Sequence, residues 1–258
     1  MFFTLLITLY PEKCKERIKE YLYCLNNNLL NPEINEIIIF FEYNNNCSFY
    51  QKLKNKKVKL EKINKRPTFK DFIKYINKYL KNKICIIANS DIYFSQKNGL
   101  NLLEKVKWNN TIISLTRYNQ VDQIQEYLKA WGKKHDNGIL KTHDNINLKS
   151  FFDDGRSQDT WIFKSPINLN YSNFNLKIGI NHCDLYLNYE LLKMKKVNIY
   201  NPCPELISIH HQKNWDYNKY KKTMLKGKLV KNKIYRKYMH SKGFRFKFIP
   251  FCKINDMI

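Results

Sequence analysis

The chain has 258 residues, with 46 Lys and Arg against 22 Asp and Glu, a formal net charge of +24 and 43% hydrophobic residues. This apolar content excludes general intrinsic disorder, and the 7 Gly and 7 Pro exclude collagen-like and linker-like chains. Half of the charge excess lies in residues 213–258, which hold 14 basic and 2 acidic residues. We therefore predict a mildly basic domain over residues 1–212 and a basic, helical C-terminal extension over residues 213–258.

Strand-like and helix-like patterns alternate over the first half of the chain. The segments of strand character are Phe2–Leu9, Ile34–Tyr43, Val58–Ile63, Lys83–Ala88 and Thr111–Leu115. Helical spacing follows Pro11 and Pro67, and a shorter helix is expected over Leu100–Val106. Because the connections are long enough for helices, we predict an α/β fold with a mostly parallel central sheet flanked by helices.

The second half begins with a polar and irregular stretch over residues 119–157, which favours long loops with room for one helix. Order then returns with a strand at Thr160–Phe163 and a helix at Asp184–Lys195. Two short strands near Val197–Tyr200 and Glu205–His210 are expected to complete the domain.

A candidate cation site follows the strand Lys83–Ala88, where the chain reads Asn89-Ser90-Asp91. Ligands of open parallel sheets bind beyond the carboxyl ends of the strands, and a carboxylate there can hold a divalent cation on phosphates. Asp91 is the first candidate ligand, Asn89 stands where a second carboxylate could be, and His210 is a further candidate. The alternatives are a turn-forming Asp91 and a structural His pair.

Other candidates concern proton transfer and the acceptor. Asp184 opens a helix, so it is either a general base for a hydroxyl or a helix cap. Asp159 stands just before the predicted strand Thr160–Phe163 and Trp161 within it. Both are expected to line an acceptor pocket, with Arg117 and Tyr118 reaching it from the other side. The alternative for the acidic segment around Asp159 is a solvated turn.

Several phosphate and hydrolase motifs are absent from the sequence. It contains no GxGxxG after the first strand, no GxxxxGK[ST] and no GxSxG. These absences argue against dinucleotide oxidoreductases, P-loop NTPases and α/β-hydrolases. An α/β domain that binds phosphates without a Gly-rich loop needs other positive charge, which a metal ion would supply.

The motifs named above, taken in order, resemble a known family. The first strand, the helix entry Arg66-Pro67-Thr68 and the run KICIIA into NSD resemble nucleotide-sugar-dependent glycosyltransferases of GT-A fold. The segments ANSDIYF, SLTRY, SQDTWIF, HCDLYLNYEL and NPC with ISIHH resemble small glycosyltransferases of large DNA viruses and bacteria. The resemblance covers residues 1–212.

This resemblance implies roles for particular residues. Asn89-Ser90-Asp91 would stand at the family's DxD position, with Mn²⁺ or Mg²⁺ on the donor diphosphate, and Asp184 would be the base of an inverting reaction. His210 would match a late His that contacts the metal or the diphosphate. The residues around the nucleotide would be Thr8, Tyr10, Arg66 and Ser90. The chain departs from the pattern at Asn89, where an amide oxygen would have to coordinate in place of an acid, or basic residues would carry the diphosphate.

The expected partners are a UDP-, GDP- or dTDP-sugar and a glycan or glycoprotein acceptor. The alternative is a nucleic-acid-binding protein or metal-dependent nuclease that uses the basic surface. The extension could also contact anionic membranes through its lysines and aromatic residues, together with Leu225 and Ile249.

The cysteines and the hydropathy pattern bear on location. Seven Cys without metal-type spacing predict reduced thiols, and neither a signal peptide nor a membrane-spanning segment is recognised. We expect a soluble or peripherally membrane-attached protein of the cytoplasm, which for a viral enzyme would be the host cytoplasm or virus factory.

Overall fold

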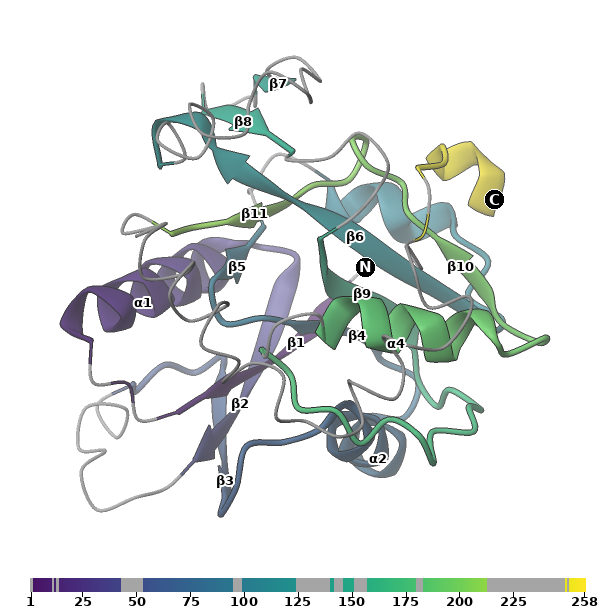
Figure 1. Ribbon diagram of the computed structural model, residues 1–258, viewed down its shortest axis with the longest axis horizontal. Helices are drawn as coiled ribbons and strands as arrows, with labels where there is room; N and C mark the ends of the chain where they lie inside the picture. The colour runs from purple at the N-terminus through teal and green to yellow at the C-terminus, as the bar shows by residue number, and fades with distance from the viewer. Residues whose placement is uncertain are drawn as a thin grey trace, which may run out of the picture.

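The computed structural model describes residues 2–10, 12, 14–42, 53–94, 99–123, 140–141, 146–150, 157–179, 183–212, 249 and 251–258. Figure 1 shows a central sheet with helix α1 (Lys15–Leu30) on one side and helices α2 (Phe69–Tyr79) and α4 (Cys183–Leu192) on the other. Each side of the sheet has its own apolar cluster, one that includes α1 and one that includes α2 and α4. The domain is therefore a three-layer α/β/α structure.

One half of the sheet is entirely parallel. Its neighbouring strands are β3 (Val58–Ile63), β2 (Ile34–Glu42), β1 (Phe3–Leu9) and β4 (Ile84–Ala88), in this order. All residues of β1 and β4 are buried, because helices cover both faces of the sheet. These continuous apolar runs are the pattern from which the sequence predicts buried strands.

The other half of the sheet is mixed. Strand β9 (Gln158–Lys164) lies antiparallel between β4 and β6 (Thr111–Gln120). Strands β10 (Asn198–Tyr200) and β11 (Ser208–His210) both pair parallel with β6. Three short strands complete the sheet, namely β5 (Ile92–Tyr93), β7 (Leu140–Lys141) and β8 (Asn147–Lys149).

The reversed direction of β9 determines which residues meet at the edge of the sheet. Ala88, the last residue of β4, pairs with Thr160 near the start of β9. The backbone N–H of Asn89 donates to the carbonyl of Asp159 over 3.2 Å, so the two residues lie side by side. Beyond β9, the pairing of Ser208 with Arg117 brings β11 and its terminal His210 to the same edge.

Local sequence explains where α2 begins. The backbone N–H of Thr68 donates to Asp71 Oδ2 over 2.9 Å, and Asp71 N–H donates to Thr68 Oγ1 over 3.3 Å. This reciprocal capping box satisfies two donors that have no partner inside the helix. The apolar residues Phe69, Phe72, Ile73 and Ile76 then fall on the buried face.

The predicted fold class is confirmed: the sheet is mostly parallel, helices flank it, and the predicted strands and helices of the domain are present. Two elements differ in extent or type. Strand β6 continues to Gln120 because β8 and β11 pair with its second half, and the short helix at Leu100–Lys105 is of the 3-10 type. Strands β5, β7 and β8 were not predicted, since two- and three-residue strands depend on distant partners rather than on a local pattern.

The last residues of the chain pack into the domain. Ile249 is 3% exposed, and its carbonyl accepts from Gln158 Nε2 and Asn201 Nδ2, each over 2.9 Å. Ile254 and Met257 are buried in the apolar cluster on the α1 side of the sheet. A boundary at residue 212 therefore does not separate these residues from the core.

The remaining predictions for the extension concern residues 213–248, which lie outside the described residues. Ile249, included in the predicted membrane contact, is buried and so cannot reach a membrane in this structure. Within the described ranges, every helix is too short or too polar to span a membrane.

Candidate functional site

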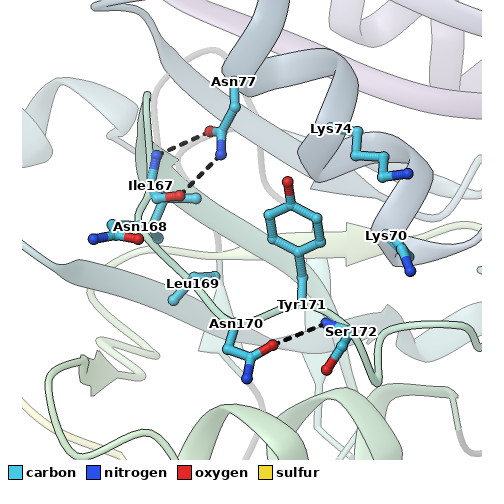
Figure 2. A pocket seen from close by; sticks show the side chains of 9 residues that line it. All are labelled: Lys70, Lys74, Asn77, Ile167, Asn168, Leu169, Asn170, Tyr171 and Ser172. Atoms are coloured by element: carbon cyan, nitrogen blue, oxygen red, sulfur yellow. Dashed lines mark hydrogen bonds between the residues drawn. The ribbon is translucent and has the colours of Figure 1, made fainter.

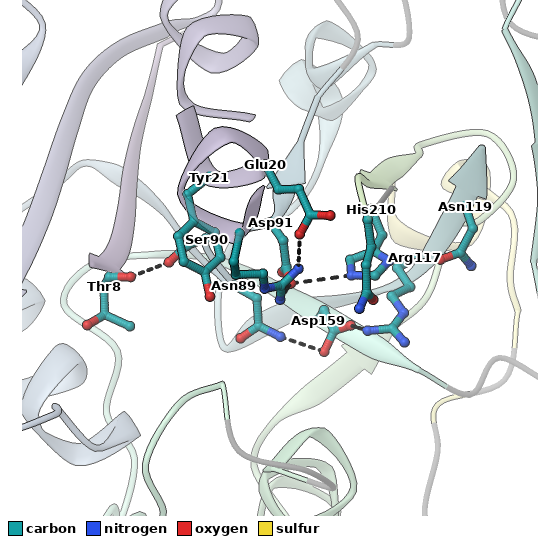
Figure 3. Close-up of polar contacts among 12 residues, drawn as sticks. Thr8, Glu20, Tyr21, Asn89, Ser90, Asp91, Arg117, Asn119, Asp159 and His210 are labelled. Carbon is teal, nitrogen blue, oxygen red and sulfur yellow. Dashed lines mark hydrogen bonds and ion pairs between the residues drawn. The ribbon is translucent and has the colours of Figure 1, made fainter. Parts of the chain in front are cut away.

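Charged and amide side chains from several parts of the fold converge at the edge where β4 ends and β9 begins (Figure 3). They come from α1, from the turn after β4, and from strands β6, β9 and β11, and α4 begins near them. We call these residues the polar cluster; its members are Arg17, Glu20, Asn89, Asp91, Arg117, Asn119, Asp159, Asp184 and His210.

Asp91 lies in a tight turn and is 8% exposed. The turn is closed by a hydrogen bond from Ile92 N–H to the carbonyl of Asn89 over 3.1 Å. The Asp91 carboxylate accepts from Arg17 Nη2 at Oδ2, and His210 Nε2 lies 3.3 Å from the same oxygen. Burial acts to raise the pKa of Asp91, but the Arg17 guanidinium outweighs it and holds this pKa well below its usual range. Asp91 is therefore ionised.

Arg17 is a functional candidate that the sequence analysis missed. Its guanidinium bridges Asp91 and Glu20, whose Oε2 lies 2.7 Å from Nη1, and it lies 4.9 Å from the centre of the Tyr21 ring. A signal was available in the sequence, because Arg17 stands one helical turn before Tyr21 and Glu20 three residues after Arg17. That spacing places all three near the buried face of α1.

His210 is held by Asn119, whose amide oxygen lies 2.8 Å from Nδ1. Since an amide oxygen only accepts, Nδ1 carries the proton and the lone pair of Nε2 faces Asp91. A cation or a second proton between Nε2 and the Asp91 carboxylate would stabilise this contact. Burial lowers the pKa of His210, and the Arg117 guanidinium acts in the same direction. The Asn119 contact thus fixes the orientation of the imidazole ring.

Asn89, Asp159 and Arg117 form a chain of hydrogen bonds. Asn89 Nδ2 donates to Asp159 Oδ1 over 2.8 Å, and Arg117 Nη1 donates to Asp159 Oδ2 over 2.5 Å. Burial raises the pKa of Asp159, Arg117 opposes this, and the nearby Asp184 raises it further. Arg117 and Asp159, both predicted from the sequence, are thus brought together.

Asp184 lies in the first turn of α4 and belongs electrostatically to the same cluster. Burial raises its pKa, opposed by the backbone N–H of Leu185 and by the Arg117 guanidinium. A carboxylate with a raised pKa is a stronger base than an exposed one, which suits proton transfer. The N–H contact also fits the helix-capping alternative, and the two roles are compatible.

The four residues expected around the nucleotide divide into two pairs. Thr8 Oγ1 donates to the carbonyl of Phe40 over 3.2 Å, and Ser90 Oγ donates to the carbonyl of Thr8, so both hydroxyls tie segments of the sheet edge together. The Arg66 guanidinium instead lies over the Tyr10 ring, with its carbon 4.0 Å from the ring centre. Only this second pair offers a surface on which an aromatic base could lie.

Two predicted acceptor residues belong to the core. Trp161 is 1% exposed, and its indole N–H donates to Asn188 Oδ1 over 3.1 Å. Tyr118 is 8% exposed and packs in the apolar cluster on the α1 side. Neither side chain lines an open surface in this structure, because Trp161 packs against Phe69 of α2 and Tyr118 lies in the apolar cluster. We therefore leave both out of the acceptor site.

The cluster offers two oxygens that suit a divalent cation. Asp91 Oδ1 and Asn89 Oδ1 are buried and have no hydrogen-bond partner among the described residues. Within that part of the chain, no group of three or more His, Cys, Asp or Glu side chains forms a complete metal cage. Mg²⁺ and similar ions are commonly bound by one or two protein oxygens together with substrate phosphates. The residues therefore fit an ion shared with a diphosphate rather than a purely structural metal.

A separate hollow of about 500 Å³ lies between α2 and residues 167–172. Figure 2 shows Lys70 and Lys74 of the helix on one side and the segment after β9 on the other. The Asn77 side chain fixes that segment by bonding both the N–H and the carbonyl of Ile167, each over 2.9 Å. The hollow contains no residue of the polar cluster, so we place the candidate site at the cluster.

The fold and the site together define a class. A mostly parallel sheet, an antiparallel β9 beside β4, and an acidic turn at the carboxyl end of β4 are the arrangement of a GT-A-type fold. No family model matches the sequence, and no curated protein matches it at significant similarity.

Solved structures resemble the chain in fold. The mannosyltransferase PcManGT from Pyrobaculum calidifontis, solved with GDP-Man and Mn²⁺, gives a TM-score of 0.51 at 12% identity, covering 93% of this chain and 64% of that one. TarS residues 1–349 from S. aureus gives 0.46 at 10% identity, covering 81% and 60%. HddC from Yersinia pseudotuberculosis gives 0.46 at 15% identity, covering 87% and 100%. The likeness to the mannosyltransferase, with a TM-score of 0.51 at 12% identity, shows a shared fold. These three structures do not support the narrower resemblance to viral enzymes.

Proposed function

We propose that this protein transfers a sugar from a nucleotide-sugar donor to a hydroxyl of a glycan or glycoprotein acceptor, with inversion at the anomeric carbon. One observation carries the proposal: two buried oxygens without partners among the described residues, Asp91 Oδ1 and Asn89 Oδ1, lie in the turn that follows β4. The carboxyl ends of strands are where open α/β sheets bind their ligands. These two oxygens, with His210 Nε2, would hold Mn²⁺ or Mg²⁺.

The donor would bind between this turn and the end of β1. Tyr10 and Arg66 would stack on the nucleotide base, and Thr8 and Ser90 would keep the ends of β1 and β4 in register beneath it. A bound divalent cation would neutralise the charge that develops on the leaving diphosphate. Arg17 would hold Asp91 ionised and in one orientation, so that Oδ1 stays turned toward the diphosphate.

The acceptor would bind on the side of α4. Asp184 would take the proton of the attacking hydroxyl, since its raised pKa makes it a better base than an exposed aspartate. Arg117 would fix the neighbouring Asp159 and so keep the start of β9 rigid beside the acceptor. Attack from the side opposite to the leaving diphosphate gives inversion of configuration.

A nucleotidyltransferase is the second candidate, because it is compatible with the same fold. Such an enzyme must hold a triphosphate as it transfers a nucleotide. The segment after β1 contains no glycine in this chain until Gly99, so it offers no Gly-rich loop to surround extra phosphates. This difference favours sugar transfer.

The proposal is tested with a panel of UDP-, GDP- and dTDP-sugars in the presence of Mn²⁺. We expect one nucleotide to raise the melting temperature and its sugar donor to release nucleoside diphosphate. Asp184→Asn should bind that nucleotide as the wild type does but release no product. Release of pyrophosphate from a nucleoside triphosphate would instead indicate nucleotidyl transfer. Stabilisation by duplex DNA without any nucleotide response would favour the nucleic-acid alternative.

A further inference from the structure

We infer that Asp159 is a positioning residue, and that it orients Asn89 so that the amide oxygen, rather than the amide N–H₂, faces the cation. Asparagine would then be the residue type that position 89 requires, because it pairs with Asp159 of β9. It would not be a poorer substitute for an acidic ligand at that position. The inference rests on the proposed function for the identity of the bound cation. The pairing of the two side chains stands on geometry alone.

The direction of the hydrogen bond fixes the orientation of the amide. An ionised carboxylate only accepts hydrogen bonds, so the group that Asn89 presents to Asp159 Oδ1 at 2.8 Å must be Nδ2. The amide oxygen therefore points away from Asp159, and it is buried without a partner among the described residues. A Cβ built on Gly179 would lie 3.9 Å from Oδ1, so this glycine lies near the amide oxygen.

The Asp159 carboxylate is itself held in place by a hydrogen bond to each of its two oxygens. Its Oδ1 accepts from Asn89, and its Oδ2 accepts from Arg117 Nη1 over 2.5 Å. With one donor on each oxygen, the carboxylate cannot rotate without losing a hydrogen bond to a buried group. Asp159 is thus better suited to fix Asn89 than to contact an acceptor hydroxyl, the role that the sequence suggested.

The same geometry explains why residue 89 is an amide. An aspartate at this position would bring two carboxylates to hydrogen-bond distance in a buried place, where like charges repel strongly. An exchange of the two residue types keeps every contact: an asparagine at position 159 would donate from its amide nitrogen to an aspartate at position 89, and its amide oxygen would accept from Arg117. The exchanged pair also carries the same total charge as the natural one.

The test compares four proteins, namely the wild type, Asn89→Asp, Asp159→Asn and the double variant Asn89→Asp/Asp159→Asn. Mn²⁺ binding is read from the free-ion EPR signal in the presence of UDP or GDP, and thermal unfolding is measured without metal. We expect Asp159→Asn to weaken Mn²⁺ binding about 10-fold, as loss of an outer partner of a metal ligand commonly does. Asn89→Asp should lower the melting temperature, and the double variant should recover both properties.

Two controls separate orientation from charge. Asp122→Asn removes one negative charge at an exposed position and should leave Mn²⁺ binding unchanged. If Asp159 acts through Asn89, then Asp159→Asn should weaken binding much less in an Asn89→Ala background than in the wild type. Equal weakening in both backgrounds would overturn the inference, because it would show that only the charge matters.

The outcomes distinguish this inference from the proposed function. A double variant that binds Mn²⁺ as poorly as Asp159→Asn and melts as low as Asn89→Asp overturns the pairing, even if the wild type transfers sugar. Recovery in the double variant supports the pairing, even if no sugar donor is ever accepted. A wild type that binds no Mn²⁺ with any nucleotide overturns both the cation site and the role of Asp159 in it.

Discussion

At the scale of single residues, the polar cluster holds more negative than positive charge. Its four acids, Glu20, Asp91, Asp159 and Asp184, face two guanidinium groups, Arg17 and Arg117. Arg17 bridges Glu20 and Asp91, and Arg117 pairs with Asp159, which leaves Asp184 as the acid whose burial is least compensated. In a chain with a net charge of +24, this local acidic surplus is a feature that a divalent cation would balance.

Asp184→Asn should make the protein more stable at neutral pH while it abolishes transfer. Because burial raises the folded-state pKa of Asp184 above the unfolded value of about 3.9, its ionisation favours the unfolded state as the pH rises through the raised pKa. The gain in melting temperature should therefore be present at pH 7 and absent at pH 3. If the variant and the wild type melted at the same temperature at pH 7 as well as at pH 3, the raised pKa of Asp184 would be contradicted.

Arg17→Met should destabilise the fold by about 3 kcal/mol at pH 7, since it leaves the buried Asp91 and Glu20 carboxylates without their cation. Arg17→Lys should recover only part of this loss, because an ammonium cannot bridge two carboxylates as a guanidinium does. The folded-state pKa of Asp91 is depressed, so the difference from the wild type should shrink as the pH falls below about 4.

Urea unfolding at pH 7 and pH 3 measures the effect of Arg17. The matched control is Lys19→Met, which removes one charge from an exposed position of the same helix. That variant should unfold within about 0.5 kcal/mol of the wild type at both pH values. If the two variants behave alike, the bridge between α1 and Asp91 does not stabilise the protein.

At the scale of elements, α1 contributes more to the site than an apolar face. Its buried residues include Glu20 and Asn28 beside Tyr21, Cys24 and Leu25. The Asn28 amide donates to the carbonyl of Ile92 over 3.0 Å and accepts from Phe94 N–H over 3.1 Å. One side chain thus holds the short strand β5, and with it the turn that carries Asp91.

Asn28→Ala should destabilise the protein by about 2 kcal/mol, because it leaves a buried carbonyl and a buried N–H without a partner. It should also weaken Mn²⁺ binding, since the Asp91 turn loses its support. Asn26→Ala, at an exposed position of the same helix, is the control and should change neither property. Hydrogen exchange of the Phe94 amide measures the local effect directly.

Most elements of the fold could be predicted because their signals are local. Apolar runs mark β1, β2 and β4, and Thr68 with Asp71 marks the start of α2. Strand β5 could not be found in this way, because it has two residues and exists only through its pairing with β11.

The candidate site was predictable where acids follow strands and unpredictable where contacts are distant. Asn89, Asp91 and His210 stand at strand ends and were predicted from the sequence, whereas Arg17 meets Asp91 across 74 positions of sequence. Trp161 was misjudged because it shares a face of β9 with Asp159. Strand periodicity does not tell which part of that face a helix covers; here Trp161 is covered and Asp159 lies at the edge of the sheet.

At the scale of the whole molecule, the C-terminal residues are part of the structure that supports the site. Gln158, the residue before Asp159, bonds the backbone of Ile249 at both its N–H and its carbonyl. A polar network therefore runs from the end of the chain to the start of β9.

Truncation after residue 212 should unfold the domain or make it aggregate. It removes the buried side chains of Ile249, Ile254 and Met257, whose loss costs roughly 5 kcal/mol, comparable to the entire stability of many domains. Circular dichroism and melting of the truncated protein check this. A truncated protein with the wild-type melting temperature would show that the C-terminal contacts are dispensable.

The same contacts have a consequence for chain continuity. Gln212 is bonded to Gln123, and Ile249 is bonded to Gln158 and Asn201, so the chain is anchored on the domain at both of these points. A single backbone cut at a protease site engineered between residues 213 and 248 would leave two fragments with no covalent link, yet each would keep its anchor. The short C-terminal fragment would remain bound as a non-covalent subunit, and the protein would then function as a complex of two chains.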